Sequence, residues 1–514
     1  MNDLSSMIRA ICSILPVFAA ANTSLAQFDP DDPLVVPGRV VAAIVAEEVV
    51  TTISRDVSFI SQSPVRVSLK AMPYAEFQFN LPDSMSARAA IRDIFERERE
   101  ASKIKWWDGV AVIDGTGGQT GSLWVSGPDS DQKQFYHQFA WREIGLVSDP
   151  FDAGWSNPRG VSNGGDVLVA VLDTGVDANH PLFGDRVSPF GGSMFPADPT
   201  FDDIGNGVDD DGDGVVDEMA GHGTFLAGLV SHIAPQAGIL PIKVLNSDGS
   251  GDTYQLGAGI LKAVDDGAHV VLIALGTYEL ASGGSSPGML MVESAIDYAV
   301  KQGVTIVASV GNRYTFSGDR CLFPANHPDV VAVGGSNESS SVAMISNVSD
   351  FITVMAPAES IAASVSRSII GPVPGGRFRG ATGTSMSTAF VAGVAALVRA
   401  QYPEWPNGDV SSEEIGGEVA SRITLSSTDV NMTLDSGVTI SRPLLDIQHA
   451  LDFTRTISPP DGDIDADGIV DGFDLGVVLG WWGAMPSDGT LHRVDQNRDF
   501  RVDGADLGIV LGFW

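Results

Sequence analysis

Apolar and polar positions follow two different periods along this chain, and the longest apolar runs lie in its middle and later parts. Residues 167–172 and 304–310 are apolar at nearly every position, as parallel strands buried on both faces of a sheet require. From Phe225 to Ile233 apolar residues recur at helical spacing, which predicts a helix that Pro235 ends. Residues 386–397 are apolar on nearly every face and predict a buried helix. These elements indicate an α/β fold with a parallel sheet.

A second pattern precedes this region. Between Gly38 and about Gly127, short alternating segments predict strands, and two segments with apolar residues at helical spacing predict helices. The resulting order, βαββαβ, is that of a small ferredoxin-like α+β domain. The predicted strands are 40–45, 65–69, 75–79 and 109–113, and the helices are 47–60 and a segment that includes Ala87, Ile91, Ile94 and Phe95.

The length of 514 residues predicts about three domains. The chain begins with Arg9, an apolar stretch from Ala10 to Ala21 and a Ser-x-Ala sequence that ends at Ala26, which together predict an export signal and a secreted protein. No later segment is long and apolar enough to span a bilayer. We therefore expect a signal peptide, a small domain, a large domain, a linker and a terminal module, with the bounds 1–26, 27–127, 128–456, 457–460 and 461–514.

The net charge of −35 excludes a nucleic acid or an anionic membrane as the expected partner, because both are bound by clustered Lys and Arg. A solubilising surface, Asp-rich metal loops and adaptation to salt each explain this charge. Of the two cysteines, Cys12 lies in the signal, so Cys321 has no partner for an intramolecular disulfide. Outside the cell, stability must then have another source, for which bound calcium is the candidate.

Three residues that together could form a catalytic triad occur in the chain order Asp173, His222, Ser385. Asp173 ends the first apolar strand, His222 begins the first predicted helix, and Ser385 lies at the amino end of the second. A serine nucleophile needs a base, and the base needs a carboxylate that fixes its tautomer. Unpaired N–H groups at a helix start can stabilise an oxyanion, and Asn312, which follows the strand 304–310, can supply a further donor.

These residues resemble those of the subtilisin-like serine proteases, whose chain order they share. The resemblance extends from about Gln138 to Leu451, and Ala274, Ala358 and Ala389 stand where the family commonly has serine, glycine and proline. Further matching segments are 244–251, 274–276, 323–325 and 330–334.

The resemblance implies a three-layer fold around a parallel sheet and the hydrolysis of polypeptides. In it, Asp173 orients His222, His222 is general base and acid, Ser385 is the nucleophile and Asn312 completes the oxyanion hole. Substrate would pair along the strand near Leu275 and Gly276. The small domain would be a propeptide that assists folding and blocks the site; a permanent accessory domain is the alternative.

The carboxyl-terminal residues contain a repeat of Asp-rich loops, each followed by an apolar helix-like run. Their spacing supplies oxygen ligands at loop positions one, three, five, nine and twelve and a backbone carbonyl at seven, which fits calcium. The pair resembles an all-α, EF-hand-like dockerin module, which implies a cohesin-like partner or, alternatively, an intramolecular clamp. The expected ligands are Asp463, Asp465, Asp467, Ile469, Asp471 and Asp474 in the first loop and Asp495, Asn497, Asp499, Arg501, Asp503 and Asp506 in the second.

A third Asp-rich segment lies upstream of His222. Its acidic residues have loop-like spacing, but position twelve is Ala220, so both a calcium site and a solvated turn remain open. The expected ligands are Asp209, Asp211, Asp213 and Asp217.

Together these patterns predict a secreted, calcium-stabilised serine endopeptidase that is made as a precursor. The terminal module could also associate it with a cell surface. The alternative is a binding protein that keeps the protease fold without turnover and acts through its calcium module.

Overall fold

The structure is a computed structural model. It describes residues 35–44, 65–68, 74–78, 94–97, 99, 104–114, 132–136, 138–146, 161–277, 289–312, 321–359, 369–407, 410–426, 428–434, 437–451 and the single positions 475, 479, 507 and 511. The predicted signal peptide, the helix 47–60, the linker and all the expected ligands of the two terminal calcium loops lie outside these residues. No helix among the described residues is long and apolar enough to cross a membrane.

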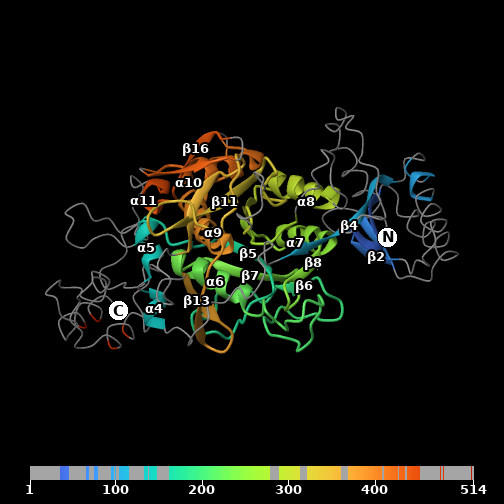
Figure 1. Cartoon of the computed structure of the whole chain (residues 1–514), viewed down its shortest axis with the longest axis horizontal. Coiled ribbons are helices and arrows are strands. Elements are labelled where there is room, and N and C mark those ends of the chain that lie inside the picture. The colour runs from blue at the N-terminus through green and yellow to red at the C-terminus, as the bar shows by residue number, and fades with distance from the viewer. Residues whose placement is uncertain are drawn as a thin grey trace.

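A seven-stranded parallel sheet forms the centre of the large domain, as the apolar runs predict (Figure 1). Its strand order is β12-β11-β10-β9-β5-β7-β6. The strands are β5 (Leu168–Asp173), β6 (Gly192–Ser193), β7 (Gly238–Lys243), β9 (Val270–Ile273), β10 (Thr305–Ser309), β11 (Val330–Asn337) and β12 (Val354–Glu359).

Helices cover both faces of this sheet, which explains the continuous apolar runs of its strands. Side chains of β5 alternate between the two cores: Val169 and Val171 pack with α6 and α9, while Ala170 and Leu172 pack on the opposite face. Helices therefore shield each face of the sheet from water, and the domain has three layers. The helices are α6 (His222–Ile233) and α9 (Thr384–Gln401) on one face and α7 (Thr253–Asp265) and α8 (Met289–Lys301) on the other.

The strand order reverses at β5, and this reversal determines where a site can form. β5 lies between β7 and β9, so the chain builds the sheet outward from β5 in both directions. The loops that leave the carboxyl ends of β5 and β9 therefore separate, and open α/β sheets bind their ligands at such a point. Asp173 is the last residue of β5.

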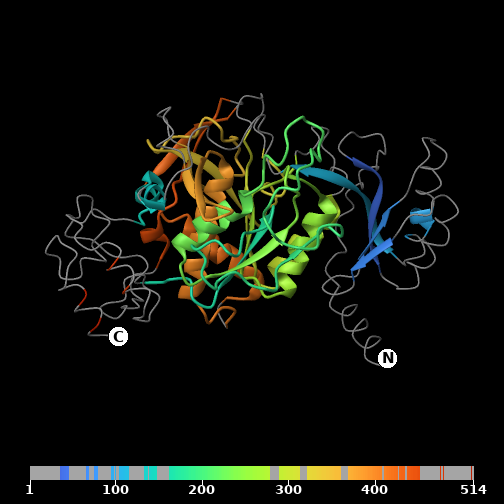
Figure 2. The same ribbon diagram turned by 90° about the horizontal axis from the view of Figure 1, so that it is seen from below.

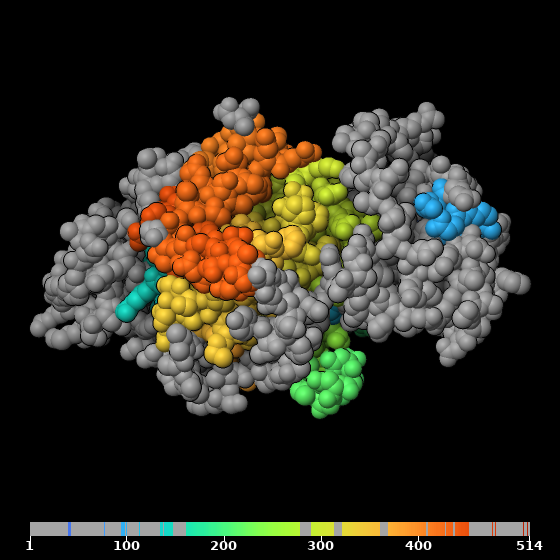
Figure 3. All heavy atoms as spheres, turned by 45° about the horizontal axis from the view of Figure 1, so that its top comes forward, coloured from blue at the N-terminus to red at the C-terminus, as the bar shows by residue number. Residues whose placement is uncertain are grey.

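The remaining described elements pack around this core, and the carboxyl-terminal ones form the orange-to-red part of the surface in Figure 3. A hairpin of β13 and β14 leads into α9, and a second hairpin of β15 and β16 joins the sheet edge through the bridge between Met355 and Leu444. Their bounds are α4 (Gln132–Tyr136), α5 (Phe139–Glu143), β13 (Ile369–Val373), β14 (Arg377–Ala381), η3 (Ser412–Glu414), α10 (Ile415–Ile423), β15 (Asp429–Thr433), β16 (Thr439–Pro443) and α11 (Ile447–Ala450).

A smaller antiparallel sheet precedes the large domain. Its strand order β2-β3-β1-β4 is the one that a ferredoxin-like βαββαβ unit produces, and helical residues are described at 94–97. The last strand, β4, is longer than predicted and runs from the small sheet to the large domain (Figure 2). There it pairs with β8 (Ser250–Asp252). The other bounds are β1 (Val35–Ile44), β2 (Val65–Ser68), β3 (Tyr74–Gln78) and β4 (Ile104–Asp114).

Candidate active site

Asp173 and His222 form a buried pair at the carboxyl end of β5. The Nδ1 atom of His222 lies 2.7 Å from Oδ1 of Asp173, and both side chains are fully buried. The same Oδ1 accepts the backbone N–H of Thr174 at 2.8 Å. We assign the imidazole proton to Nδ1 from this contact, which leaves Nε2 as the basic nitrogen.

The start of α6 holds the imidazole against the end of β5. A Cβ at Gly223 would lie only 2.1 Å from the carbonyl oxygen of Gly175, so only glycine lets the helix start approach this closely. Gly221 precedes His222 with a φ of +95°, which glycine adopts without strain. The Nε2 atom of His222 is buried and has no hydrogen-bond partner among the described residues. Nδ1 therefore orients the imidazole, while Nε2 makes no hydrogen bond to the described residues.

Ser385 approaches the same edge of the sheet from α9. It is the second residue of that helix, at the amino end where the sequence predicts it, and it is 2% exposed. Its Oγ lies 3.5 Å from the carbonyl oxygen of Ala274. Because β5 and β9 pair in register at Leu172 and Ile273, Ala274 lies beside Asp173 on the neighbouring strand. The hydroxyl thus contacts the residue that follows β9, next to the end of β5 that carries Asp173.

Asn312 lies beside the first turn of α9. Its Oδ1 accepts the backbone N–H and the hydroxyl of Thr384, at 2.8 and 2.9 Å. These bonds fix the carboxamide so that Nδ2 is its donor end, and Nδ2 lies 3.3 Å from where a Cβ of Gly383 would be. The backbone N–H groups in the first turn of a helix have no intrahelical acceptor. The N–H of Thr384 already donates to Asn312 and that of Met386 to Gly383. The N–H of Ser385 and Nδ2 of Asn312 are then the donors that can stabilise a negative charge next to Ser385.

Comparison with known proteins agrees with this geometry. The model of the subtilase family matches residues 164–429, which is more than half of the chain. Subtilisin Savinase from Lederbergia lenta is 32% identical over 259 residues, which cover 48% of this chain and 81% of the relative.

The protein belongs to the subtilase family. Subtilisin NAT from Bacillus subtilis subsp. natto is 32% identical over 257 residues. The matched residues make up 48% of this chain and 59% of that relative. The crystal structure of fervidolysin from Fervidobacterium pennivorans has the same fold, with a TM-score of 0.58 and 19% identity over 82% of this chain and 62% of that chain. The subtilisin-like α/β fold expected from the motifs is thereby confirmed.

The residues expected to bind substrate follow β9 directly. Leu275 is buried, and Gly276 lies so close to the neighbouring chain that a Cβ would be 2.3 Å from the carbonyl oxygen of Phe323. Thr277 exchanges two backbone hydrogen bonds with Phe323. Leu275 and Gly276 follow Ala274, the residue that Ser385 contacts, and their role in substrate binding stays a prediction.

The Asp-rich loop of this subtilase projects from the large domain below β6 (Figure 1). The structure places Asp209 and Asp211 next to Asp248, and Asp211 and Asp213 next to Glu218, with carboxylate oxygens in each group within 4.8 Å of one another. Neither Asp248 nor Glu218 was expected from the sequence, because Asp248 comes from another loop and Glu218 lies off the twelve-residue spacing.

Asp217 has a different place from the one expected. Its two oxygens accept the backbone N–H groups of Asn206 and Gly207, at 2.8 and 2.9 Å, and close the base of the loop. Burial, followed by repulsion from Asp248 and Asp211, raises the pKa of Glu218 to about 7. The loop therefore concentrates negative charge that a cation would relieve.

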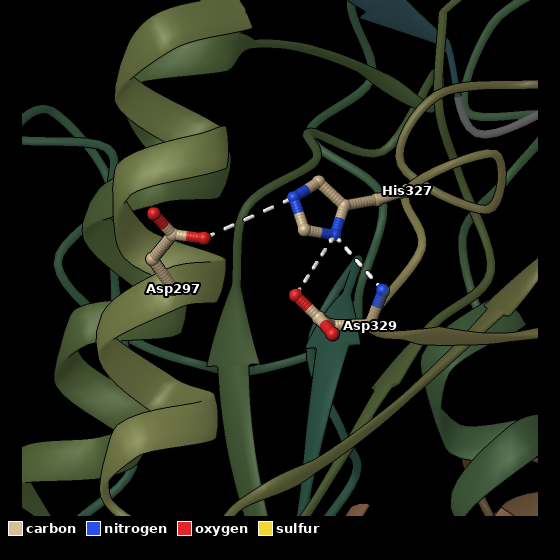
Figure 4. Close-up of side chains that lie close together, drawn as sticks. All are labelled: Asp297, His327 and Asp329. Atoms are coloured by element: carbon tan, nitrogen blue, oxygen red, sulfur yellow. Dashed lines mark hydrogen bonds and ion pairs between the residues drawn. The ribbon is translucent and has the colours of Figure 1, made fainter. Parts of the chain in front are cut away.

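A further polar cluster lies away from the catalytic edge, where His327 stands between Asp297 of α8 and Asp329 (Figure 4). Nδ1 of His327 accepts the backbone N–H of Asp329 at 3.2 Å, and Nε2 lies 4.0 Å from Asp297. A neutral imidazole with Nδ1 as acceptor carries its proton on Nε2, so neither nitrogen offers a lone pair to a metal. Burial lowers the pKa of His327, against the opposing effect of Asp329 and Asp297, and so favours the neutral imidazole. A structural role agrees with this arrangement.

Proposed function

We propose that this subtilase is a serine endopeptidase that hydrolyses polypeptides through Asp173, His222 and Ser385. The observation that carries the proposal is the buried 2.7 Å contact between His222 and Asp173 at the strand end beside the residue that Ser385 contacts. The sheet holds a base, its orienting carboxylate and a hydroxyl at one edge. That combination serves nucleophilic acyl transfer.

In the proposed reaction, Oγ of Ser385 attacks the scissile carbonyl carbon while Nε2 of His222 takes the hydroxyl proton. The carbonyl oxygen becomes an oxyanion that the N–H of Ser385 and Nδ2 of Asn312 stabilise. His222 then gives its proton to the leaving amine, which leaves an acyl-enzyme. Water, deprotonated by His222, attacks the ester and restores Ser385. Asp173 stabilises the imidazolium through its contact with Nδ1.

Hydrolysis of casein by the purified chain tests this proposal. The wild-type protein should release peptides, and Ser385→Ala should lose at least about a thousandfold in rate, because triad members act as a unit. Ser387→Ala is the matched control, since Ser387 lies one residue past Met386 and its hydroxyl donates to the carbonyl oxygens of Ala356 and Pro357. Equal rates for wild type and Ser385→Ala would favour the alternative, a binding protein without turnover.

The small amino-terminal domain, residues 27–127, supports a second part of the proposal: a propeptide that blocks the site. Its strand β4 adds to β8 in antiparallel register, from Val112 opposite Asp252 to Asp114 opposite Ser250. An extended peptide that adds to an exposed edge uses main-chain hydrogen bonds for affinity and side-chain pockets for specificity. Ile113 is 1% exposed and belongs to the same core cluster as Leu275. A chain that occupies this edge would compete with substrate.

We also propose calcium as the cation of the Asp-rich loop. The donors that the structure brings together are all carboxylate oxygens, the ligands that calcium prefers. Asp209, Asp211, Asp213, Asp248 and Glu218 would hold it, and Asp217 would shape the loop. Asp248 also accepts the backbone N–H groups of Asp210 and Asp217, so it joins this loop to the segment that ends in β8. The bound ion would stabilise the approach to His222.

For the terminal residues 461–514 the proposal rests on sequence alone. Two calcium loops would order a dockerin-like module that binds a cohesin-like partner, and residues 1–26 would direct secretion. Full-length protein with and without calcium, mixed with an immobilised cohesin domain, tests the adaptor function. Capture in calcium that EDTA reverses supports an adaptor, and no capture in either condition supports an intramolecular clamp.

A further inference from the structure

A second buried carboxylate, Asp203, joins the two chain segments that carry Asp173 and His222. Asp203 is 1% exposed and belongs to the segment between β6 and α6. Its Oδ1 accepts the hydroxyl of Thr174 and the backbone N–H of Gly221, both at 2.8 Å. Its Oδ2 accepts the backbone N–H and the hydroxyl of Thr224, at 2.8 and 2.6 Å.

These four bonds surround the catalytic pair. Thr174 follows Asp173 in the chain, and Gly221 and Thr224 flank His222 in the first turn of α6. The Thr174 hydroxyl also accepts the backbone N–H of Gly223 at 3.0 Å. One carboxylate therefore fixes the end of β5 and the start of α6 relative to each other, through bonds on both sides of the 2.7 Å contact.

Only a carboxylate satisfies this set of donors. Each oxygen of Asp203 faces one backbone N–H and one hydroxyl, so an asparagine in either orientation would point its NH₂ group at a backbone N–H. Burial raises the pKa of Asp203, and the four donors oppose that effect. The geometry is thus built for a buried negative charge that no cationic side chain among the described residues contacts.

The Thr174 hydroxyl has one proton and two acceptors. It lies 2.8 Å from Oδ1 of Asp203 and 3.2 Å from Oδ1 of Asp173, so the proton goes to Asp203. Without Asp203 the proton would turn to Asp173 and reduce the charge that Asp173 presents to His222. The loss of the Asp203 charge acts in the same direction. Both changes make the protonated imidazole less stable.

We propose that Asp203 is a positioning residue of the catalytic centre: it holds Thr174 and the first turn of α6 so that Asp173 orients His222 and keeps its full charge. This inference rests on the proposed function. Charged groups on the elements around the pair include Asp177, whose backbone N–H donates to Thr224, and Lys243, which lies opposite Asp173 on β7. Asp177 accepts the backbone N–H groups of Asn179 and Gly375, while Lys243 binds Asp198 and the carbonyl oxygen of Asp202. The described first turn of α9 has no charged side chain.

The test is Asp203→Asn, measured with an internally quenched peptide chosen from the sites that the enzyme cuts in casein. We expect kcat to fall by about 10- to 100-fold with KM within about threefold, the pattern of a misplaced catalytic group. The acid limb of the pH profile of kcat/KM should move to lower pH. Asp446→Asn is the matched control, because Asp446 caps α11 by accepting two backbone N–H groups far along the chain from the triad. A folded Asp203→Asn with kcat within twofold and an unmoved acid limb overturns the proposal.

Two variants of Thr174 test the proposal even if Asp203→Asn does not fold. Thr174→Val removes the hydroxyl bridge at nearly constant volume and should lower kcat at least fivefold, whereas Thr174→Ser should restore most of it. Equal activity of both variants overturns the proposal.

A third measurement does not need turnover. The far-downfield proton resonance of Nδ1, identified by its loss in His222→Ala, should shift in Asp203→Asn and stay in place in Asp446→Asn. If wild type and Ser385→Ala are equally active, the proposed function fails while this resonance still decides the role of Asp203. An unshifted resonance in the folded variant contradicts it.

Discussion

Glu143, the last residue of α5, carries a buried carboxyl group whose ionisation opposes folding. Its Oε1 accepts the hydroxyl of Ser336 at 3.0 Å, and its Oε2 is buried without a hydrogen-bond partner among the described residues. Burial raises the pKa of Glu143 to about 7; the Ser336 bond opposes the shift and repulsion from Glu338 adds to it. Its hydrogen bond to Ser336 joins α5 to β11, so the ionisation of Glu143 reports on this packing.

The sign of the pH effect follows from the raised pKa. Below about pH 4.5 the carboxyl is protonated in both the folded and the unfolded chain, and its contribution to stability is fully present. Between about pH 4.5 and 7 the unfolded chain ionises while the folded chain does not, so stability falls as pH rises. A shift from 4.5 to about 7 corresponds to at most about 3 kcal/mol. Above about pH 7 the loss is complete and constant.

Glu143→Gln removes this ionisation and keeps the size of the side chain. Below about pH 4.5 we expect the free energies of unfolding of the variant and the wild type to differ by a constant amount. By pH 8 the variant should have gained up to about 3 kcal/mol of stability relative to the wild type. Urea unfolding at several pH values, in the Ser385→Ala background to prevent self-digestion, measures the difference. Glu413→Gln, at an exposed position of η3, is the control and should show no such trend. A Glu143→Gln difference that is independent of pH would refute the reasoning.

Other perturbations test the proposed site and its supports. Asn312→Ala should lower kcat about 100- to 1,000-fold with little change in KM, the cost of removing such a donor from a subtilisin, and steady-state kinetics with a normal kcat would contradict its role. EDTA should lower the thermal unfolding midpoint of Ser385→Ala by several degrees, and by less when Asp248→Asn is added; an unchanged midpoint argues against calcium. In the freshly refolded, uncut chain, Ile113→Asp should hydrolyse peptide faster than Ile113→Val, because a buried charge weakens the packing of β4. Equal rates would show that β4 does not inhibit the site.

The sequence was informative wherever a proposed site residue lies at the end of a regular element. Asp173 ends a strand that is apolar on both faces, and His222 begins a helix with a clear period, so local pattern alone predicts both positions. The same reasoning predicts the strands of the small sheet, because their alternation is strong. The terminal calcium loops stay a prediction, since they lie outside the described residues.

Residues that act through loop backbone could not be predicted in this way. Asp203 and Asp248 bind N–H groups of segments distant in sequence, and nothing in their neighbours along the chain signals those partners. The pairing of β4 with β8 joins segments whose contact depends on the packing of two domains. Glu143 lies at the end of a short helix, and its burial is set by Ser336 on β11. Such contacts come from tertiary structure, which propensity and periodicity do not encode.

The central claim is that Ser385 is a nucleophile activated by His222. A fluorophosphonate probe, followed by mass spectrometry of the digested protein, tests it most directly, because the probe reacts with serines that an adjacent base activates. The account predicts labelling of Ser385 in the wild type and none in Ser385→Ala, with labelling strongly reduced in His222→Ala. Labelling of a different residue, or equal labelling of the wild type and His222→Ala, would contradict it.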